Sequence, residues 1–304
     1  MTAFKKKLIK YIPLYIMLFP GFLYILINNY IPMAGIIIAF KNLDFRKGIL
    51  KSDWAGLSNF EFLFKSPDAF LITRNTILYN TVFIITTLVF SVLVAILLSE
   101  IRSRKCVKLY QTMILLPFLI SYVIVSYLAY AFLSNETGFI NGVLKQLGIN
   151  PVSWYTEPKY WPIILTFINV WKSLGYSAII YLASILGIDQ ELYEAAAIDG
   201  TSKLKQIRYI TLPLIKPTVI TMLLLQIGRI FYSDFGLFYQ VPLNSGALMD
   251  ATNTIDTYVF RGLMTLGDIS MSSAAGVYQS FVGFLLVLLA NWITKKYSAE
   301  NALF

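Results

Sequence analysis

The chain has 304 residues, of which 57% are hydrophobic and only 13% are charged, whereas soluble domains carry about 25% charged residues. A mean hydropathy of +0.67 and long apolar runs along the whole length exclude a water-soluble protein and favour a single membrane domain, residues 1–304. The one cysteine, Cys106, and the absence of histidine exclude a disulfide framework and a Cys-rich metal site, and they argue against hydrolytic chemistry in this chain. The net charge of +9 is compatible with nucleic-acid binding, but in a membrane protein it is better explained by basic cytoplasmic loops facing anionic lipid.

Six stretches of the chain are long and apolar enough to cross a bilayer, which takes about 20 residues for about 30 Å of hydrocarbon. They indicate an all-α, polytopic membrane protein with six transmembrane helices. The first stretch follows four lysines, as the apolar part of a signal peptide would. Its apolar run is too long for that and lacks a small-residue cleavage site, so we expect a mature helix. The expected helices are Ile12–Tyr30, Asn75–Leu98, Leu109–Leu133, Trp161–Leu186, Thr218–Phe238 and Ala274–Ile293.

The distribution of lysine and arginine predicts the orientation of these helices. With the N-terminus inside, the cytoplasmic segments hold 14 basic residues, whereas the longer outer segments hold eight. Aromatic residues from Trp154 to Trp161, just before the fourth helix, fit the outer headgroup level. We therefore expect a multi-pass protein of the cytoplasmic membrane with both termini in the cytoplasm. In the first outer segment, 41–74, charges mixed with Trp54 and several phenylalanines predict a short interfacial helix rather than a seventh span.

Two of the expected helices carry polar faces, because residues three or four apart lie on the same side of an α-helix. A rise of about 1.5 Å per residue places Lys172 roughly 16 Å from Trp161, and Arg229 roughly 18 Å from Pro217, so both cations are expected near mid-depth with no obvious carboxylate. Such groups line a transport pathway or bridge neighbouring helices. For the polar stripe of the second helix, Asn80, Thr87 and Ser91, helix packing is the better interpretation. The residues predicted to line a substrate pathway are Asn169, Lys172, Tyr176, Gln226, Arg229 and Tyr232.

The cytoplasmic segment 188–216, between the fourth and fifth helices, is expected to be a folded helical hairpin. Its first helix should end at Gly200, because glycine accepts the left-handed conformation of a helix end. Thr201 is expected to cap the second helix, and Pro213 and Pro217 are expected to break the chain before the fifth span. On these residues alone, an ordinary amphipathic connector is an equal alternative.

The spacing of residues in this hairpin resembles the cytoplasmic signature of permeases from binding-protein-dependent ABC importers. The signature comprises Glu194, Ala195, Ala196, Gly200, Ile210, Leu212 and Pro213. The form Ile198-Asp199-Gly200 resembles the carbohydrate branch, the maltose-type permeases. Four further segments make the whole chain similar to LplB-like oligosaccharide permeases: Pro32–Lys41, Tyr232–Gln240, Ile255–Val259 and Tyr278–Gly283.

This resemblance implies the type I ABC importer permease fold and a coupling helix that lies in a groove of an ATP-binding subunit. It implies import of oligosaccharides by alternating access, with pathway residues contacting sugar hydroxyls and a tyrosine ring lying against the sugar. Some LplB-like systems are associated with uronic-acid oligosaccharides, so we hypothesise an acidic glycan. The residues implied in ATPase coupling are Glu194, Ala195, Ala196, Asp199, Gly200, Leu212 and Pro213.

The resemblance also implies partners: a second, different permease subunit, two cytoplasmic ATP-binding subunits and an extracellular solute-binding lipoprotein. The sequence contains no Gly-x-x-x-x-Gly-Lys-Ser/Thr phosphate loop, so we expect ATP and Mg on the partner ATPase subunits and no cofactor or metal in this chain. The chain is then a transport subunit rather than an enzyme. Two alternatives stay open: an ABC permease for another solute, such as glycerol phosphate or a peptide, and an ATP-independent secondary transporter.

Overall fold

The computed structural model describes residues 3–297, which form two compact units. The first unit contains residues 3–66 and 261–278, and the second contains residues 67–260 and 279–297. The last helix, α15 (Ile269–Tyr297), contributes to both, because the boundary falls within it. That the chain works as one membrane domain stays a prediction.

The first unit begins with a long, nearly unpacked helical segment. Helix α1 (Ala3–Ile25) continues through a π-helical turn, Leu26–Tyr30, into α2 (Ile31–Met33) and a 3-10 segment, Ala34–Phe40. Residues 11–40 are long and apolar enough to span a membrane, but only 6% of that apolar stretch is buried. These side chains therefore need lipid or another subunit to cover them.

The segment that follows, residues 41–66, contains short helices and no helix long enough to span a membrane, as its composition predicted. It folds around a two-stranded antiparallel ladder of β1 (Lys41–Asn42) and β2 (Asp53–Trp54), in which Lys41 pairs with Trp54. The Lys41 ammonium is buried and donates to the carbonyls of Ile49 and Leu50 at 3.1 and 2.7 Å. Such side-chain to backbone bonds fix the segment, and an interfacial position of its helices stays a prediction. Its short helices are α3 (Gly48–Lys51), a 3-10 turn (Ser58–Phe60) and α4 (Phe62–Lys65).

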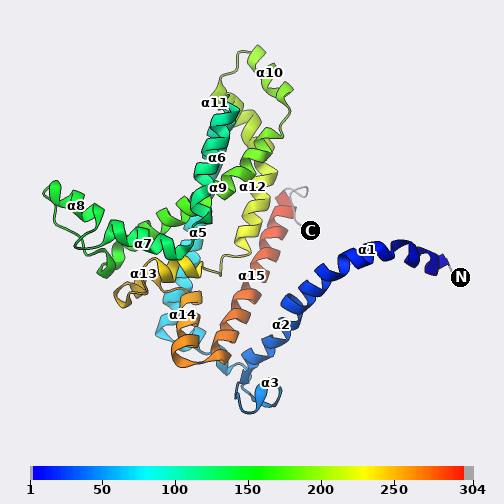
Figure 1. The fold of residues 1–304 in the computed structure, drawn as a ribbon, viewed down its shortest axis with the longest axis vertical. Helices are drawn as coiled ribbons and strands as arrows, with labels where there is room; N and C mark the ends of the chain where they lie inside the picture. The colour runs from blue at the N-terminus through cyan, green and yellow to red at the C-terminus, as the bar shows by residue number, and fades with distance from the viewer. Residues whose placement is uncertain (1–2, 298–304) are drawn as a thin grey trace. The chain divides into compact units, whose positions relative to one another are not determined.

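The second unit is a bundle in which α9 (Trp161–Leu186) lies between α5 (Pro67–Ser99), α6 (Arg104–Leu119) and α12 (Leu212–Ile227) (Figure 1). Within residues 3–297, five helices are long and apolar enough to cross a membrane, and the number is six when the sharply bent pair is counted as one span. The predicted all-α membrane fold with six transmembrane helices is confirmed.

The third span is not the continuous helix expected over Leu109–Leu133. It consists of α6 and α7 (Tyr122–Leu133), whose axes differ by 96°. Ile120 is extended, and Ser121 caps α7 by accepting a hydrogen bond from the Ile124 amide at 3.4 Å. Apolar residues continue through both helices, so hydropathy gave no sign of the break.

The fifth span also differs from its prediction, Thr218–Phe238. The chain is helical from Lys203 to Ile227 through α11 (Lys203–Gln206), a π-helical segment (Ile207–Thr211) and α12. Pro213 lies in the first turn of α12 and Pro217 inside it, so neither breaks the helix; a π-helical segment is one of the local adjustments that accommodate proline in membrane helices. The helix instead ends at Ile227, and the chain is irregular up to a second π-helical segment, Gly236–Gln240.

The remaining elements are short and connect or cover the ends of the spans. They are α8 (Phe139–Gln146), two 3-10 turns (Trp154–Thr156 and Pro158–Tyr160), α10 (Gln190–Ile198), a 3-10 turn (Gly246–Leu248), α13 (Met249–Thr252), α14 (Ile255–Arg261) and a π-helical turn (Gly262–Leu266).

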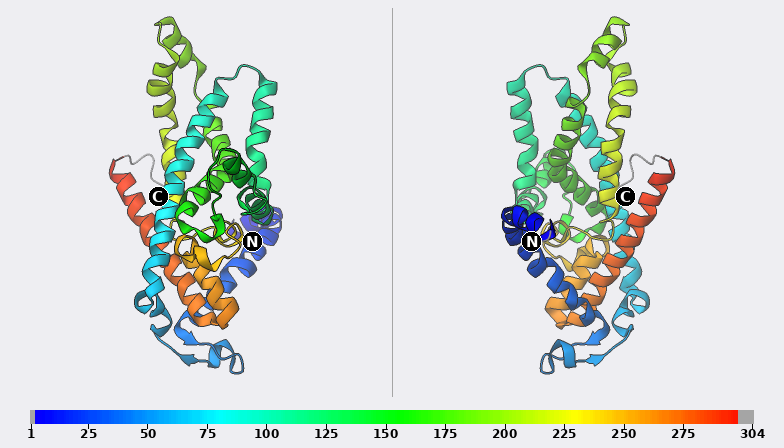
Figure 2. Two further views of the ribbon diagram at one scale, coloured as in Figure 1. Left: turned by 90° about the vertical axis from the view of Figure 1, so that its left-hand side faces the viewer. Right: turned by 90° about the vertical axis from the view of Figure 1, so that its right-hand side faces the viewer.

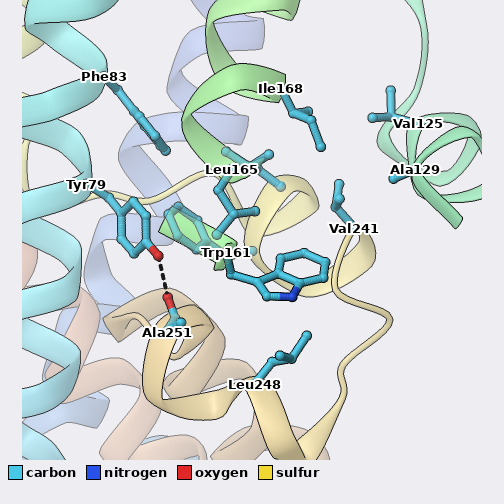
Figure 3. Close-up of a cluster of buried hydrophobic side chains, with 12 residues drawn as sticks. Tyr79, Phe83, Val125, Ala129, Trp161, Leu165, Ile168, Val241, Leu248 and Ala251 are labelled. Carbon is cyan, nitrogen blue, oxygen red and sulfur yellow. Dashed lines mark hydrogen bonds between the residues drawn. The ribbon is translucent and has the colours of Figure 1, made fainter. Parts of the chain in front are cut away.

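Two clusters of buried side chains hold the second unit together, one near each end of α9. The first is built around Trp161 and Leu165, and its Tyr79 hydroxyl donates to the Ala251 carbonyl at 2.7 Å (Figure 3). The second contains Tyr181 and Leu182, near the other end of α9. The stretch of α9 that carries the predicted polar face, 169–176, therefore lies between two tightly packed regions.

Candidate functional site

The segment 188–216, here called the coupling hairpin, projects beyond the other helices at one end of the second unit (Figure 2). The Asp189 carboxylate caps α10 by accepting from the Glu191 amide at 3.0 Å. At the other end, Gly200 has φ of 73° and its amide donates to the Ala197 carbonyl at 3.0 Å. The Thr201 amide donates to the Ala196 carbonyl at 2.9 Å, which completes the usual glycine-ended helix motif. The predicted helix end at Gly200 is confirmed.

The cap predicted for the second helix of the hairpin is wrong by one residue. Ser202, not Thr201, occupies the N-cap position of α11, and its side chain makes no capping hydrogen bond. The glycine-ended motif uses the Thr201 amide, so the chain turns one residue later than the pattern indicated.

The residues predicted for ATPase coupling lie mostly on the outside of the hairpin. Glu194, Ala195, Asp199 and Gly200 are exposed and Ala196 is half-buried. Beside the turn, the apolar side chains of Ile198 and Leu204 are 87% and 79% exposed. Leu212 and Pro213 are separate from this tip, because they lie in the first turn of α12. Their roles in coupling stay predictions.

Three side-chain contacts stabilise the coupling hairpin, and one of them attaches it to the rest of the bundle. The Tyr193 hydroxyl lies 2.9 Å from the Thr211 hydroxyl. The Lys203 ammonium pairs with Glu100, at the end of α5, at 3.3 Å. Gln206 is buried and its amide donates to the Thr201 carbonyl at 3.3 Å. The Tyr193 and Gln206 contacts hold the hairpin's own helices together, and the Lys203–Glu100 pair connects the hairpin to the neighbouring α5–α6 turn.

The polar face of α9 contacts α5 and the broken third span. The Asn169 amide donates to the Thr87 hydroxyl at 3.4 Å. Lys172 is 6% exposed, and its ammonium donates to the Pro117 carbonyl at 3.0 Å and to the Ile120 carbonyl. Tyr176 is half-exposed and stacks on Phe118, with ring centres 5.0 Å apart and planes 15° apart.

Phe118 is a neighbour of the predicted site that sequence reasoning missed. It belongs to the last turn of α6, within an apolar run, and nothing in that run distinguishes it. Only the crossing of α6 and α9 places its ring against Tyr176. That crossing is close, because a Cβ at Gly175 would overlap the backbone carbonyl of Ile114.

The irregular chain after α12, residues 228–235, is called the unwound segment. Non-helical backbone at membrane depth is tolerated where its polar groups are satisfied or where it lines a watery cavity. Here the Asn80 amide donates to the carbonyls of Ile230 and Tyr232 at 2.8 and 3.1 Å. The Gln279 amide donates to the Phe231 carbonyl at 2.7 Å, and Ser233 donates to Asp256 from its amide and its hydroxyl.

The predicted pathway residues of the fifth span lie in or beside this unwound segment. Gln226 is partly buried at the end of α12, and Arg229 is exposed one turn further on. The Tyr232 hydroxyl lies 2.7 Å from the Ser280 hydroxyl. The estimated depth of Arg229 took Pro217 as the start of the span, whereas the helix begins at Lys203 and ends at Ile227, so the mid-depth position stays a prediction. That the six predicted residues form one pathway stays a prediction.

Two further expectations concern polar groups. The packing role of the second helix's stripe is confirmed, because Asn80, Thr87 and Ser91 all hydrogen-bond to other elements, Ser91 to the Leu174 carbonyl at 3.4 Å. For Lys172, no ion pair with a carboxylate is present within residues 3–297, and its expected lack of a carboxylate partner stays a prediction. Asp234, in the unwound segment, lies within electrostatic reach of Lys172 and of the Tyr122 hydroxyl.

A groove of about 1,020 Å³ runs between α5 and α9 on the other side of the bundle. Most of its lining surface is apolar, including Val82, Phe90, Ile163 and Phe167, and its polar lining residues are Arg74, Asn75, Thr86, Lys159, Thr166 and Asp250. At about 100° per residue, the groove-lining face of α9 points away from Lys172. A solute rich in hydroxyl groups needs polar partners, so the groove does not suit one and the polar face remains the candidate pathway.

Comparisons with known proteins cover nearly the whole chain. Residues 91–298 match the family model described as "Binding-protein-dependent transport system inner membrane component". Over 295 residues, the chain is 36% identical to the polygalacturonan/rhamnogalacturonan transport system permease protein YteP of Bacillus subtilis (strain 168), covering 97% of this chain and 91% of that protein. It is 35% identical over 289 residues to Protein LplB of the same organism, covering 95% and 90%.

Solved structures show the same agreement. A bacterial ABC transporter involved in the import of the acidic polysaccharide alginate gives a TM-score of 0.88 at 30% identity, covering 98% of this chain and 100% of that chain. A bacterial alginate ABC transporter in complex with an alginate pentasaccharide-bound periplasmic protein gives a TM-score of 0.86 at 30% identity, covering 96% and 97%. The matched region contains the coupling hairpin, the polar face of α9 and the unwound segment.

Proposed function

Because this chain belongs to the family of inner-membrane components of binding-protein-dependent transport systems, we propose that it forms the pathway for an acidic oligosaccharide. It is a multi-pass membrane protein and the permease subunit of an oligosaccharide ABC importer. Its own role is transport rather than catalysis, and a solute-binding protein is its partner. What we propose beyond this function is that the transported oligosaccharide is negatively charged.

The observation that carries the proposal is the exposed guanidinium of Arg229 beside the unwound segment. Among residues 3–297, no carboxylate lies within ion-pair distance of Arg229. Arginine binds carboxylates with two parallel hydrogen bonds, so a uronic acid is a suitable ligand. The names of similar proteins support this choice, since one transports polygalacturonan and another imports the acidic polysaccharide alginate.

The other pathway residues supply contacts of the kinds a sugar requires. Asn169 and Gln226 carry amides that can hydrogen-bond to hydroxyl groups. Tyr176 and Tyr232, 50% and 38% exposed, offer aromatic faces. Lys172 lies behind this group, since its ammonium is occupied by backbone carbonyls.

ATP hydrolysis takes place, in this proposal, on two separate cytoplasmic subunits that hold ATP and Mg. The exposed Ile198 and Leu204 at the tip of the coupling hairpin support docking there. Glu194, Ala195, Ala196, Asp199 and Gly200 would contact the ATPase, and Leu212 and Pro213 would transmit its movement to α12. A second permease subunit completes the assembly, and closure of the ATPases drives alternating access.

The substrate proposal is tested by uptake of matched acidic and neutral oligosaccharides into cells carrying Arg229→Gln. Charge-assisted hydrogen bonds contribute about 1.5–3 kcal/mol, so acidic uptake should fall roughly tenfold or more while neutral uptake stays within about twofold. Lys145→Gln, on the exposed face of α8, is the matched control and should leave both rates unchanged. An equal loss for both substrates would mean that Arg229 has a structural role and would contradict the proposal.

Orientation and the ATPase partner are tested separately. In a Cys106→Ser background, single cysteines at Lys105 and Lys203 should be protected from an impermeant thiol reagent in intact cells, and cysteines at Lys145 and Arg261 should react. Labelling at 203 from outside would overturn the orientation. Purification without any ATP-binding subunit from a cell that makes the complete system would favour the secondary-transporter alternative.

A further inference from the structure

The bend between α6 and α7, here called the elbow (Pro117–Tyr122), places the end of a helix inside the bundle. The last carbonyls of any α-helix lack intrahelical donors and carry a partial negative charge. In water, solvent satisfies them, but at membrane depth another group must do so. Within the elbow, the Ile120 amide donates to the Pro117 carbonyl at 3.3 Å, and the remaining acceptor capacity needs a donor from outside the third span.

Lys172 of α9 is that donor. Its ammonium has three N–H groups. It donates one hydrogen bond to the Pro117 carbonyl, at 3.0 Å, and another to the Ile120 carbonyl. The whole residue is 6% exposed. These two bonds leave at most one N–H of a nearly buried ammonium for a substrate carboxylate.

The same ammonium is surrounded by further negative groups. It lies 4.6 Å from the centre of the Tyr122 ring, on the face where a cation is attracted. That ring packs against the backbone of Gly236, where a side chain would collide with it. Asp234 contributes a carboxylate from the unwound segment. Elements of the third, fourth and fifth spans thus converge on one cation, which compensates its burial.

We propose that Lys172 is a positioning residue whose ammonium fixes the elbow of the third span to α9, and that it does not select the charge of the substrate. Through the Pro117 carbonyl it also sets the stack of Phe118 on Tyr176, since Phe118 follows Pro117 and Tyr176 lies one helical turn after Lys172. This role goes beyond the proposed function and holds whether the substrate is acidic or neutral.

The first test compares Lys172→Met, Lys172→Arg and the control Lys145→Met for uptake of matched acidic and neutral oligosaccharides. Methionine keeps the length but has no donor, so both uptake rates should fall together, by about tenfold or more. Arginine can donate to two carbonyls, so it should recover most of the loss. Selective loss of acidic uptake in Lys172→Met, with neutral uptake retained, would overturn the proposal, as would an arginine variant no better than methionine.

The second test measures the elbow itself. Spin labels at Leu109 on α6 and Tyr127 on α7, which are 59% and 69% exposed, report the distance between its two arms in a Cys106→Ser background. Lys172→Met should broaden or shift this distance, and Lys172→Arg should preserve it. An unchanged distance in an assembled Lys172→Met protein would overturn the proposal. If Lys172→Met fails to assemble, assembly of Lys172→Arg with the native distance supports it, and failure of both overturns it.

Discussion

The coupling hairpin and the elbow each join two helices through a sharp turn, yet they are stabilised in opposite ways. In the hairpin, every bond of the turn is local: Gly200 and Thr201 bond to carbonyls three and five residues before them. In the elbow, the carbonyls of Pro117 and Ile120 are bound by Lys172, which is 55 and 52 residues away. A turn exposed to water can rely on its own residues, whereas a turn inside a membrane bundle needs a distant partner.

The largest effect is expected where the elbow region is packed most tightly. In Gly175→Val, the new side chain would collide with the Ile114 carbonyl and push α6 away from α9, and with it the elbow from Lys172. Overpacking typically costs 1–3 kcal/mol, and we expect about 3 kcal/mol or more here because backbone must move. Thermal unfolding and yield of the solubilised complex measure this.

Gly142→Val in α8 is the control for that experiment, because a Cβ there meets nothing within 4 Å. It should assemble with little change. A Gly175→Val protein with normal yield and unfolding temperature would show that the close crossing of α6 and α9 is not needed.

A large functional effect with little loss of stability is expected from Gly200→Pro in the hairpin. Proline fixes φ near −65°, whereas Gly200 has φ of 73° and donates its amide to Ala197. We expect substrate-stimulated ATP hydrolysis and uptake to fall about tenfold or more while the bundle unfolds within about 2 °C of the unaltered protein. Glu194→Lys should act in the same direction by altering the docking surface.

Gly200→Asn tests whether coupling needs the backbone turn or glycine itself, because asparagine tolerates the left-handed region that the turn requires. It should keep most of the coupling. Normal stimulated hydrolysis in Gly200→Pro would show that the turn is not needed for coupling. Disassembly of its bundle would show that the hairpin turn is not independent of the rest of the bundle.

An intermediate effect is expected from Asn80→Leu, which leaves the carbonyls of Ile230 and Tyr232 without their side-chain donor. Hydrogen bonds between membrane helices contribute about 0.6 kcal/mol on average and up to about 1.7, so we expect a loss of about 1–2 kcal/mol on unfolding. Thr81→Val is the control, since the Thr81 hydroxyl bonds only within α5, to the Ile77 carbonyl. Equal effects of the two substitutions would show that Asn80 does not hold the unwound segment.

The smallest effect is expected from Glu100→Gln, which breaks the ion pair to Lys203 at the base of the hairpin. The two side chains are 44% and 68% exposed, and exposed pairs contribute about 0–1 kcal/mol. Uptake should stay within about twofold of the unaltered rate at low and high salt. A loss above about fivefold would mean that the α5–α6 turn transmits the hairpin's movement through this pair.

The hairpin and the number of spans were predictable from the sequence because their causes are local. Apolar runs of about 20 residues determine membrane helices, and Gly200 after an alanine-rich helix determines a turn. The ladder in residues 41–66 was not predictable in this way. It depends on hydrogen bonds from Lys41 to carbonyls eight and nine residues later, and amino-acid composition does not reveal such pairings.

Pattern reasoning also placed Lys172 on a polar face, but it could not say what that face meets. The residue's partners are backbone carbonyls of a span that looks uniformly apolar by hydropathy, and the local signals of its bend, Pro117 and the N-cap Ser121, say nothing of which distant side chain binds it. In the fifth span, the prolines that suggested a break lie within a continuous helix, while the real break after Ile227 follows no proline.

By itself, then, the sequence determined which segments enter the membrane, how the coupling hairpin turns and which face of α9 is polar, because each depends on residues within a few turns of one another. Only the tertiary structure decided where the third and fifth spans bend and which carbonyls hold Lys172. Inside a membrane bundle a broken helix is stable only when its exposed backbone groups are satisfied by other elements, and for the elbow and the unwound segment those partners, Lys172, Asn80 and Gln279, lie tens of residues away.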